Sequence, residues 1–507
     1  MTASEVSAGF DVVIVGGGSA GAALANRLSA DPAREVLLLE AGKAYRSSEF
    51  PSSLLDPAMV GTEIEHDWHY EATVDDSGRT ISTPRGRVLG GSSAINGSVA
   101  LRPRAADILS WGAGGLEGWS LDEVRETLRL LENTPTGDEA WHGRSGTFPI
   151  RQRTYEELTP SVRAFIDASV HQGFRRIDDF NAGEQNGAGP YPLSVIDEIR
   201  QNTGMVYLTD EVRRRPNLAI GAETEVNRVV IDRGVTTGVL TVDGRRIAAG
   251  EVILSSGTFG SAAILLRSGI GPAVQLRQHG IEVVADLPVG QRFQDHPFYY
   301  NVHAIRPECA DMRPAAGALL WTASSEASQG ELDLQISATH FNVDPAASPT
   351  GGAIVLAIGV TRPDSIGTVA LRSRDPQDAP VISHNFLAEP RDQRRLLEGV
   401  KLARRIARDE RMAFVLAGEL SPGDNVRDDK TLVRVIREQL GSYKHPTSTA
   451  PMGGPDDPWA VVDNSAAVLG LDRLRVVDAS ILPHVPSTPT NVATIMLAEH
   501  ISRRYYA

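Results

Sequence analysis

Cysteine is almost missing from this chain of 507 residues, in which Cys309 is the single copy. A chain with one cysteine cannot form an intramolecular disulfide, so the disulfide-stapled classes of secreted protein are excluded. The opening segment, MTASEVSAGF, lacks the apolar core of a secretory signal. No apolar run approaches the ~20 residues that span a bilayer. We therefore expect a cytoplasmic protein with no integral membrane segment.

Positive charge is scarce as well. The chain has 50 Lys and Arg against 64 Asp and Glu, which gives a formal net charge of −14. Because nucleic acids and anionic membranes select proteins with a basic excess, neither partner is expected. The rest of the composition, 41% hydrophobic over 507 residues, is that of a soluble protein with room for two cores. We expect two domains and no metal site.

The most informative segment that is present contains a glycine turn. Val12–Val15 is a β-branched run suited to a buried parallel strand, and Gly16, Gly18 and Gly21 follow it in GxGxxG spacing. In this pattern the first glycine permits a tight turn, and the second lets the backbone approach a pyrophosphate. The third lets the following helix pack on the strand, and the free N–H groups at the helix start favour the anion.

A second strand and an acid complete this unit. Val36–Leu39 is a short apolar run that ends at Glu40, about 20 residues beyond the glycines, where a carboxylate can accept hydrogen bonds from an adenosine ribose. An isolated glycine turn is weak evidence. Strand, helix, second strand and acid together predict a dinucleotide site.

Further strands and helices follow along the chain. A small β-meander is predicted within residues 222–248, followed by a buried strand at Glu251–Ser255 and a helix at Ser261–Ser268. Near the end, a strand at Leu474–Asp478 precedes an amphipathic helix at Asn491–Tyr505. The segment between these regions predicts a second domain, with antiparallel strands at Leu332–Val343, Ala353–Thr361 and Gly367–Leu371 and helices around 390–409 and 430–440.

The chain resembles the glucose-methanol-choline (GMC) oxidoreductases, in particular the branch with choline dehydrogenases, choline oxidases and hydroxymethylfurfural oxidases. Seven segments match in the family's order: GGGSAGAALANRLS, RGRVLGGSSAINGSV, ILLRSGIGP, LPVGQRFQDHP, GTVALRSRDP, KHPTSTAPMG and LRVVDASILPHVPSTPTNVATIMLAEHI. The resemblance implies FAD and an α/β (α+β) fold of GMC type, with a Rossmann-type FAD-binding domain and a substrate domain on a six-stranded antiparallel sheet. It implies an FAD-binding domain at 1–145, 206–296 and 438–507, and a substrate-binding domain at 146–205 and 297–437.

The resemblance assigns two catalytic positions, His445 and Asn491. Oxidation of an alcohol by hydride transfer to flavin N5 requires removal of the hydroxyl proton, which an imidazole with an ordinary pKa near ~6.5 can accept at neutral pH. His445 is therefore the expected base. Asn491 cannot exchange protons usefully, but its amide can donate to the developing alkoxide and orient the carbinol. Pro489 and Asn491 open a helix whose positive end is expected to face the pyrimidine side of the flavin.

Plainer roles exist for these two residues. A histidine before proline is in most sequences a loop residue held by structural hydrogen bonds. Asn491 after Thr490 also fits the usual position of asparagine at a helix cap. For Asn491 the two roles are compatible.

Other histidines receive no catalytic role. His484 lies outside the matched catalytic position, and His296 is interpreted as structural. His340 is close to the substrate-domain histidine that some choline-oxidising members use, but an ungapped match puts Ser337 at that position. This departure weakens a choline assignment.

The loop at 85–99 is informative through a missing histidine. Several members of the family attach FAD covalently through a histidine in this loop, and Ile95 occupies the corresponding position here. We therefore expect non-covalent FAD. The residues expected to hold it are Gly16, Gly18, Ser19, Ala20, Gly21, Glu40, Ala41, Val88, Gly90, Gly91, Asn96, Gly97, Val99, Val226, Asp478, Ala479, Asn491 and Val492.

The substrate is less determined. The segment His66–Tyr70 resembles the family's lid, and its aromatics fit an entrance or plain packing equally well. No set of aromatics in the sequence commits to a cage for a quaternary ammonium. Three functions stay open. The expected one is FAD-dependent oxidation of a small-molecule alcohol, with electrons passed to oxygen, a quinone or a protein. The others are an FAD-containing lyase of hydroxynitrile-lyase type and a catalytically silent flavoprotein.

Overall fold

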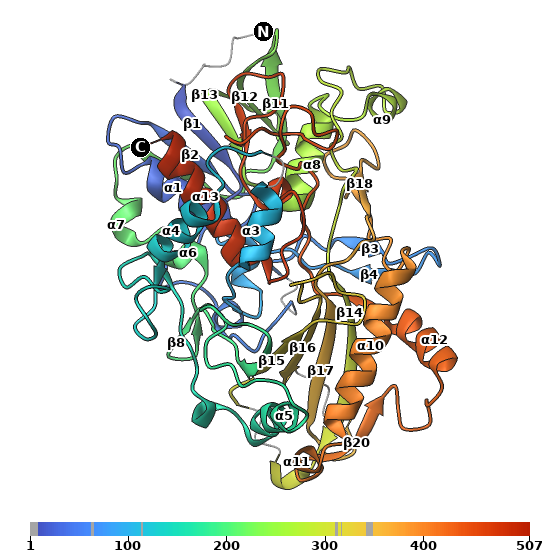
Figure 1. Cartoon of the computed structure of the whole chain (residues 1–507). Helices are drawn as coiled ribbons and strands as arrows, with labels where there is room; N and C mark the ends of the chain where they lie inside the picture. The colour runs from blue at the N-terminus through green and yellow to red at the C-terminus, as the bar shows by residue number, and fades with distance from the viewer. Residues whose placement is uncertain are drawn as a thin grey trace.

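Two large sheets occupy opposite ends of the molecule in the computed structural model, and helices cover both of them (Figure 1). The structure describes residues 9–61, 65–112, 115–309, 313–315, 317–340 and 348–506. Within these residues, no helix combines the length and the apolar character that crossing a membrane requires.

The first sheet is built on the N-terminal strand, helix and strand. β1 (Phe10–Val15) pairs in parallel with β2 (Val36–Leu39) on one side and with β13 (Arg246–Leu254) on the other. β10 (Leu218–Gly221) extends the sheet beyond β2, and β22 (Leu474–Val476) pairs with β13, both in parallel. Because these strands are buried on both faces, their β-branched and leucine-rich runs fit parallel pairing. Three distant parts of the chain therefore meet in one sheet.

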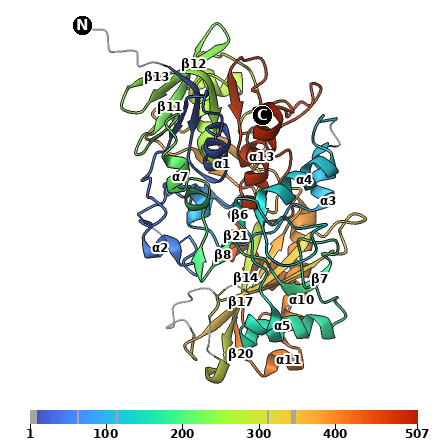
Figure 2. The same cartoon turned by 90° about the vertical axis from the view of Figure 1, so that its left-hand side faces the viewer.

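An antiparallel meander and three helices complete this end of the molecule. β11 (Val226–Asp232) pairs with β12 (Val235–Thr241), which pairs with β13. The buried helices are α1 (Ser19–Leu28), α8 (Gly257–Arg267) and α13 (Thr490–Tyr505), and α1 packs against α13. Figure 2 shows that α13 has its C-terminal end at the outside and its first residues toward the middle of the molecule.

The second sheet is antiparallel throughout. Its main path has six strands, and the short β21 (Gly441–Ser442) pairs with one of them near the middle of the molecule. Helices α5 (Pro160–His171) and α10 (Pro390–Ala407) pack on one face and share a hydrophobic core with it. The six strands in order are β20 (Leu416–Ser421), β14 (Pro297–Ile305), β17 (Ala353–Val360), β16 (Leu334–Thr339), β15 (Ala318–Thr322) and β7 (Gly187–Pro190).

The smaller elements connect the two ends. A four-stranded sheet has the order β18 (Thr368–Ala370), β19 (Val381–Ser383), β3 (Glu71–Thr73) and β4 (Thr80–Ser82). The two-residue strands pair as β5 (Glu132–Asn133) with β6 (Phe148–Pro149) and β8 (Val195–Ile196) with β9 (Ile199–Arg200). The other α-helices are α2 (Ser52–Leu55), α3 (Ala105–Gly112), α4 (Leu121–Leu131), α6 (Thr203–Val206), α7 (Asp210–Arg213), α9 (Ala273–Gln278), α11 (Glu410–Ala413) and α12 (Asp429–Gln439).

Most predicted elements are found, with shifted ends such as the start of α8 at Gly257, and three strands differ from the prediction as follows. The predicted strand Leu332–Val343 is β16, Leu334–Thr339, and its last three predicted residues lie outside the described residues. The predicted strand Gly367–Leu371 is β18, but it joins the four-stranded sheet instead of the large antiparallel one. The strand predicted at Glu251–Ser255 is the end of the longer β13, because the meander runs into the buried strand without a break.

Candidate active site

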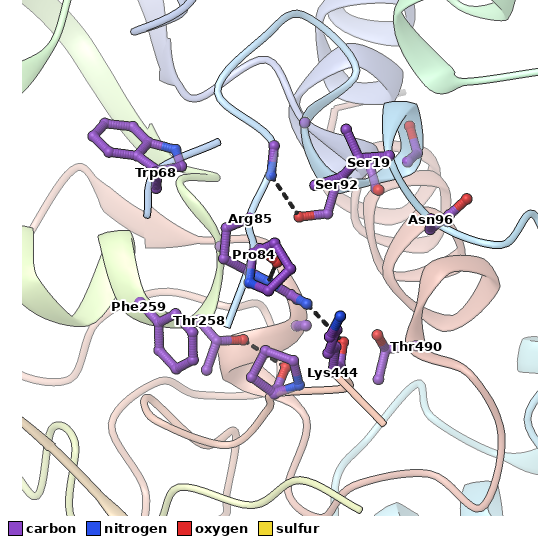
Figure 3. Close-up of a pocket in the computed structure, with 18 of the residues that line it drawn as sticks. Ser19, Trp68, Pro84, Arg85, Ser92, Asn96, Thr258, Phe259, Lys444 and Thr490 are labelled. Atoms are coloured by element: carbon purple, nitrogen blue, oxygen red, sulfur yellow. Dashed lines mark hydrogen bonds between the residues drawn. The ribbon is translucent and has the colours of Figure 1, made fainter. Parts of the chain in front are cut away.

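A cavity of about 590 Å³ lies where the two sheets approach each other. This volume is in the usual range of small-molecule and cofactor sites, ~300–1,000 Å³. Its walls come from the ends of β1 and β2, the loop at 84–97, the first residues of α13, and residues of β14, β16 and β17. Figure 3 shows side chains of α1, the loop at 84–97, α8 and the first turn of α13 around one space.

The glycine turn forms one end of the cavity. Gly16 has a φ of 98°, and a Cβ there would lie 2.5 Å from the carbonyl oxygen of Ser255. A Cβ on Gly21 would lie 1.8 Å from the carbonyl oxygen of Gly16, so this glycine lets α1 pack on β1. Gly18 is the N-cap of α1 and supplies no side-chain cap, which leaves N–H groups of the first turn for a ligand. These features fit a pyrophosphate group.

Glu40 and the loop at 85–99 lie beside this turn. Glu40 is buried and accepts hydrogen bonds of 2.8 Å from the backbone N–H groups of Gly17 and Gly42, while burial raises its pKa. A Cβ on Gly91 would lie 2.7 Å from Cα of Gly18, so the loop and the turn touch. Ile95 is buried and lines the cavity with a hydrocarbon side chain that offers no atom for a covalent bond to flavin.

The structure brings most of the predicted cofactor residues to this cavity. Those on its wall are Gly16, Gly18, Ser19, Ala20, Glu40, Ala41, Gly91, Asn96, Gly97, Val99, Val226, Asp478, Ala479 and Asn491. Gly21, Val88, Gly90 and Val492 lie behind the wall. The carboxylate of Asp478 accepts hydrogen bonds from Ser261, from Ser480 and from the backbone N–H of Gly257. Because its side chain is engaged in this way, its backbone is the part left for a ligand.

Asn491 lies in the first turn of α13 and does not cap it. The N-cap is Pro489, which supplies no side-chain cap. The hydroxyl of Ser19 donates a hydrogen bond of 2.7 Å to Oδ1 of Asn491, so the amide nitrogen is the group left for the cavity. Two uncapped helix N-termini, those of α1 and α13, therefore point at one cavity, and both favour negative charge.

His445 reaches the cavity from the segment that follows β21. Its backbone N–H donates to Oδ1 of Asp295 at 2.8 Å, and its ring stacks on Tyr443 with centroids 4.8 Å apart. The next residue, Pro446, accepts a hydrogen bond of 2.7 Å from Thr258 through its carbonyl. The histidine is thus fixed by its backbone, while its ring lines the cavity.

A second imidazole contacts the first. Nδ1 of His296 lies 3.0 Å from Nδ1 of His445, and the two rings are nearly perpendicular at 87°. Burial lowers the pKa of His445 well below its usual value, and the neighbouring His296 ring and the positive charge of Arg85 act in the same direction. Burial also lowers the pKa of His296 to about 3. The expected ordinary pKa of His445 is therefore wrong for this environment, and both rings are neutral at pH 7.

A buried carboxylate holds both histidines. Oδ1 of Asp295 accepts the backbone N–H groups of His296 at 2.7 Å and of His445 at 2.8 Å, and Oδ2 accepts the hydroxyl of Ser442 at 2.6 Å. Burial raises the pKa of Asp295 to about 6, although these donors oppose the shift. Sequence reasoning missed Asp295 and missed the contact of His296. The available signal was the pair Asp295-His296 in the matched segment LPVGQRFQDHP.

Aromatic and polar groups form the opposite wall. The ring of Phe298 lies 4.0 Å from that of Tyr443, and Ser337 shares a hydrogen bond of 2.7 Å with the Tyr443 hydroxyl. Ser337 thus lines the cavity, as does His340, whose ring contacts the hydroxyls of Thr159 and Ser161.

The remaining predicted positions divide between the cavity and its surroundings. The ring of His484 contacts Arg292, and neither residue lines the cavity. In the lid segment, Trp68 and Tyr70 line the cavity with stacked rings 5.9 Å apart, and Arg87 lies over Trp68 at 4.8 Å. These two aromatics therefore pack together and face the cavity at the same time.

Sequence comparison identifies the family. Two GMC oxidoreductase models match residues 10–298 and 363–498. Oxygen-dependent choline dehydrogenase of Rhizobium etli is 33% identical, covering 96% of this chain and 94% of that protein. The corresponding protein of Vibrio vulnificus is 33% identical, covering 97% of this chain and 93% of that one.

Structure comparison agrees. The crystal structure of pyridoxine 4-oxidase from Mesorbium loti has a TM-score of 0.90 and 31% sequence identity, covering 98% of this chain and 99% of that one. Formate oxidase, at 24% identity with a TM-score of 0.88, shares the fold. The chain belongs to the GMC oxidoreductase family, whose members bind FAD, and it is an alcohol oxidoreductase.

Proposed function

We propose that this enzyme oxidises the CH–OH group of a small-molecule alcohol to a carbonyl, with His445 as the general base and FAD as the hydride acceptor. The observation that carries the proposal is the meeting of the His445 imidazole and the Asn491 amide on one cavity that also receives two uncapped helix N-termini.

His445 has one ring nitrogen left for a substrate, because Nδ1 faces His296. Two neutral imidazoles that meet through Nδ1 share a single hydrogen. Nε2 of His296 is buried and has no hydrogen-bond partner among the described residues, so geometry alone does not assign the shared hydrogen. We propose that it lies on Nδ1 of His445. His445 then donates from Nδ1, and its Nε2 carries the lone pair that accepts the hydroxyl proton. The lowered pKa keeps this nitrogen unprotonated through the neutral range.

Asn491 complements the base. Its Oδ1 is engaged by Ser19, so its amide hydrogens are free to donate to the alcohol oxygen as negative charge develops there. FAD, when bound, supplies the flavin that takes the hydride. The uncapped start of α13 favours the negative charge that the flavin gains on reduction. With Ile95 on the wall, we propose that FAD is held without a covalent bond.

Replacement of the base tests this proposal. His445→Ala removes the proton acceptor and leaves the glycine turn and its helix intact, so we expect normal FAD content and a loss of about 10²–10⁴-fold in flavin reduction. Anaerobic stopped-flow absorbance of the flavin against a panel of aryl, aliphatic, sugar and amino alcohols measures this step. Equal rates in the variant and the parent would remove His445 from the mechanism.

The same experiment separates the other functions. A lyase converts a cyanohydrin without bleaching the flavin, and a silent flavoprotein binds FAD that no alcohol reduces. Reoxidation of the reduced enzyme with oxygen and, in parallel, with a quinone identifies the electron acceptor. Bleaching by an alcohol supports the proposal, and a flavin that stays oxidised with every alcohol of the panel contradicts it.

A further inference from the structure

Lys444 differs from the surface lysines of this chain in its position on the cavity wall and in its lack of an ion-pair partner among the described residues. The sequence contains only four lysines. Lys43 and Lys401 are half exposed and form ion pairs at the surface. Lys444 is half-buried on the cavity wall immediately before His445, and across the described part of the chain its ammonium has neither a hydrogen bond nor an ion pair. A cation that is withdrawn from water without a partner is costly, and this cost suggests a ligand.

The ammonium group lies against the loop at 57–61. A Cβ added to Gly61 would lie 3.1 Å from Nζ of Lys444, and both residues line the cavity. Lys444 has a φ of 64°, a strained conformation for a residue with a side chain. Figure 3 shows Lys444 beside Arg85, and Thr490, the first residue of α13, lines the same cavity. The charge therefore lies on the wall of the same cavity as both proposed catalytic residues.

Arg85 adds a second positive charge at this place. Its guanidinium donates to the carbonyl of Lys444 at 2.9 Å and to the carbonyl of Pro84 at 2.6 Å. These carbonyls accept hydrogen bonds from the guanidinium without neutralising its charge. Asp67 and Asp295 attract Arg85 and Lys444 only from a distance, since no ion pair within 4 Å joins either acid to either base in the described residues. The wall beside His445 is therefore positive.

The carboxylates of the cavity are engaged elsewhere. Glu40 and Asp478 are held by the donors described above. Glu225 pairs with Arg87 at 3.2 Å, and Asp378 accepts from Ser373 at 2.5 Å. These four are the acids on the described wall. A cationic substrate would thus find no unengaged carboxylate there, and it would meet Lys444.

We infer that Lys444, supported by Arg85, forms an anion-recognition subsite beside His445, so that the preferred alcohol carries a carboxylate. The inference rests on the proposed function, because it places the carboxylate relative to the carbinol that His445 deprotonates. Burial and the neighbouring Arg85 lower the pKa of Lys444, and a bound carboxylate stabilises the charged ammonium and reverses that shift. The rings of Tyr443 and Phe298 contact each other and line the same cavity, which suits a substrate with a flat ring.

A matched series of benzyl alcohols tests the subsite in the holoenzyme. The probes carry a para carboxylate, a para carboxamide or a para trimethylammonium group, so that charge changes while the carbinol and ring stay the same. Anaerobic flavin reduction gives the ratio of rate constant to dissociation constant for each probe. In the parent enzyme we expect this ratio to be about 10- to 100-fold higher for the carboxylate than for the carboxamide, with the trimethylammonium probe lowest.

Variants at position 444 isolate the charge. Lys444→Met keeps most of the side-chain volume but removes the charge. The ratio of rate constant to dissociation constant for the carboxylate probe should then fall to that of the carboxamide probe, whose own ratio should change by less than about 3-fold. Lys444→Arg is the matched control and should keep the order of the probes. Binding of benzoate and benzamide, followed by perturbation of the flavin spectrum, gives the same comparison without turnover. Benzoate should lose affinity in the Met variant, and benzamide should not.

Each other outcome has a definite meaning. Reduction by all three probes with no preference for the carboxylate overturns the subsite and leaves the proposed function standing. An equal loss for all three probes in the Met variant also overturns it, since Lys444 would then serve the cofactor or the fold. A flavin that no probe reduces, in an enzyme that other alcohols do reduce, rejects the aromatic carboxylate class. A flavin that no alcohol reduces contradicts the proposed function itself.

Discussion

Asp295 shows how single residues of the site carry opposing charges inside a buried region. Its carboxylate is the acceptor that fixes the backbone of both imidazoles, yet within the described residues no Lys or Arg forms an ion pair with it within 4 Å. The ring of His384 lies 3.8 Å from Oδ2, but burial lowers its pKa to about 3, so this ring is neutral. Asp295 attracts Arg85 and Lys444, but only from a distance. The site therefore holds this carboxylate at the expense of stability.

The destabilisation of the folded chain by the ionised carboxylate of Asp295 depends on pH and can be measured. Asp295 has a pKa of about 6 in the folded chain against 3.8 ordinarily. An acid whose pKa is raised by folding contributes stability that is fully present below its ordinary pKa. This stability is lost as the pH rises through the pKa in the folded chain. The loss amounts to about 3 kcal/mol above pH 7. Asp295→Asn keeps an acceptor at Oδ1 and removes the charge, so its Tm relative to the parent should rise by about 1–2 °C between about pH 5 and about pH 7.5.

Thermal unfolding of the holoenzyme at the two pH values gives this difference. Asp76→Asn, at a side chain that is 91% exposed, is the control and should show the same Tm difference at both pH values. A constant offset between Asp295→Asn and the parent at both pH values would show that the carboxylate is ionised throughout, which contradicts the raised pKa.

At the scale of elements, the contact of α1 with β1 decides where the cofactor-facing N–H groups lie. Alanine in place of glycine inside an ordinary helix gains about 1 kcal/mol. At Gly21 the sign is reversed, because the new Cβ would lie 1.8 Å from the backbone oxygen of Gly16. The helix must then move away from the strand. We expect Gly21→Ala to lower stability by about 1–3 kcal/mol and to reduce FAD content in the purified protein.

Flavin absorbance per protein and the Tm of the variant measure these effects. Gly418→Ala in β20 is the matched control, since a Cβ there meets nothing within 4 Å. Full FAD content and an unchanged Tm in Gly21→Ala would mean that α1 accommodates the methyl group, and the close approach would then have no role in cofactor binding.

The elements also show what a sequence can predict. The β-branched run, the glycine spacing and the acid indicate β1, α1 and β2 because local sterics and burial determine them. The membership of β18 in a separate small sheet was not predictable, since it depends on pairing with β19 and, through it, β3. The contact between His296 and His445 joins residues 149 positions apart, and no periodicity encodes such a distance.

At the scale of the whole molecule, the cavity exists because three separate stretches of chain build one sheet and the rest builds another. The GMC family and fold were predictable from the sequence, because seven segments match motifs of the family in the same order. The division into an FAD-binding domain at 1–145, 206–296 and 438–507 and a substrate-binding domain at 146–205 and 297–437 stays a prediction. The charge of the wall beside His445 was not predictable, since Lys444 and Arg85 are 359 positions apart.

The cavity between the two ends links cofactor binding to the stability of the whole chain. A ligand that binds only the folded state stabilises it by RT ln(1 + [L]/Kd), about 2.7 kcal/mol at 100 times Kd. If Ile95 excludes a covalent bond, the stability of the folded chain must depend on the concentration of free FAD. The Tm should then rise by about 2–3 °C when free FAD is added in excess. Acid precipitation of the protein should also release the yellow colour into the supernatant. A Tm that does not change when FAD is added, together with yellow flavin that stays in the precipitate, would show a covalent attachment at a residue other than Ile95.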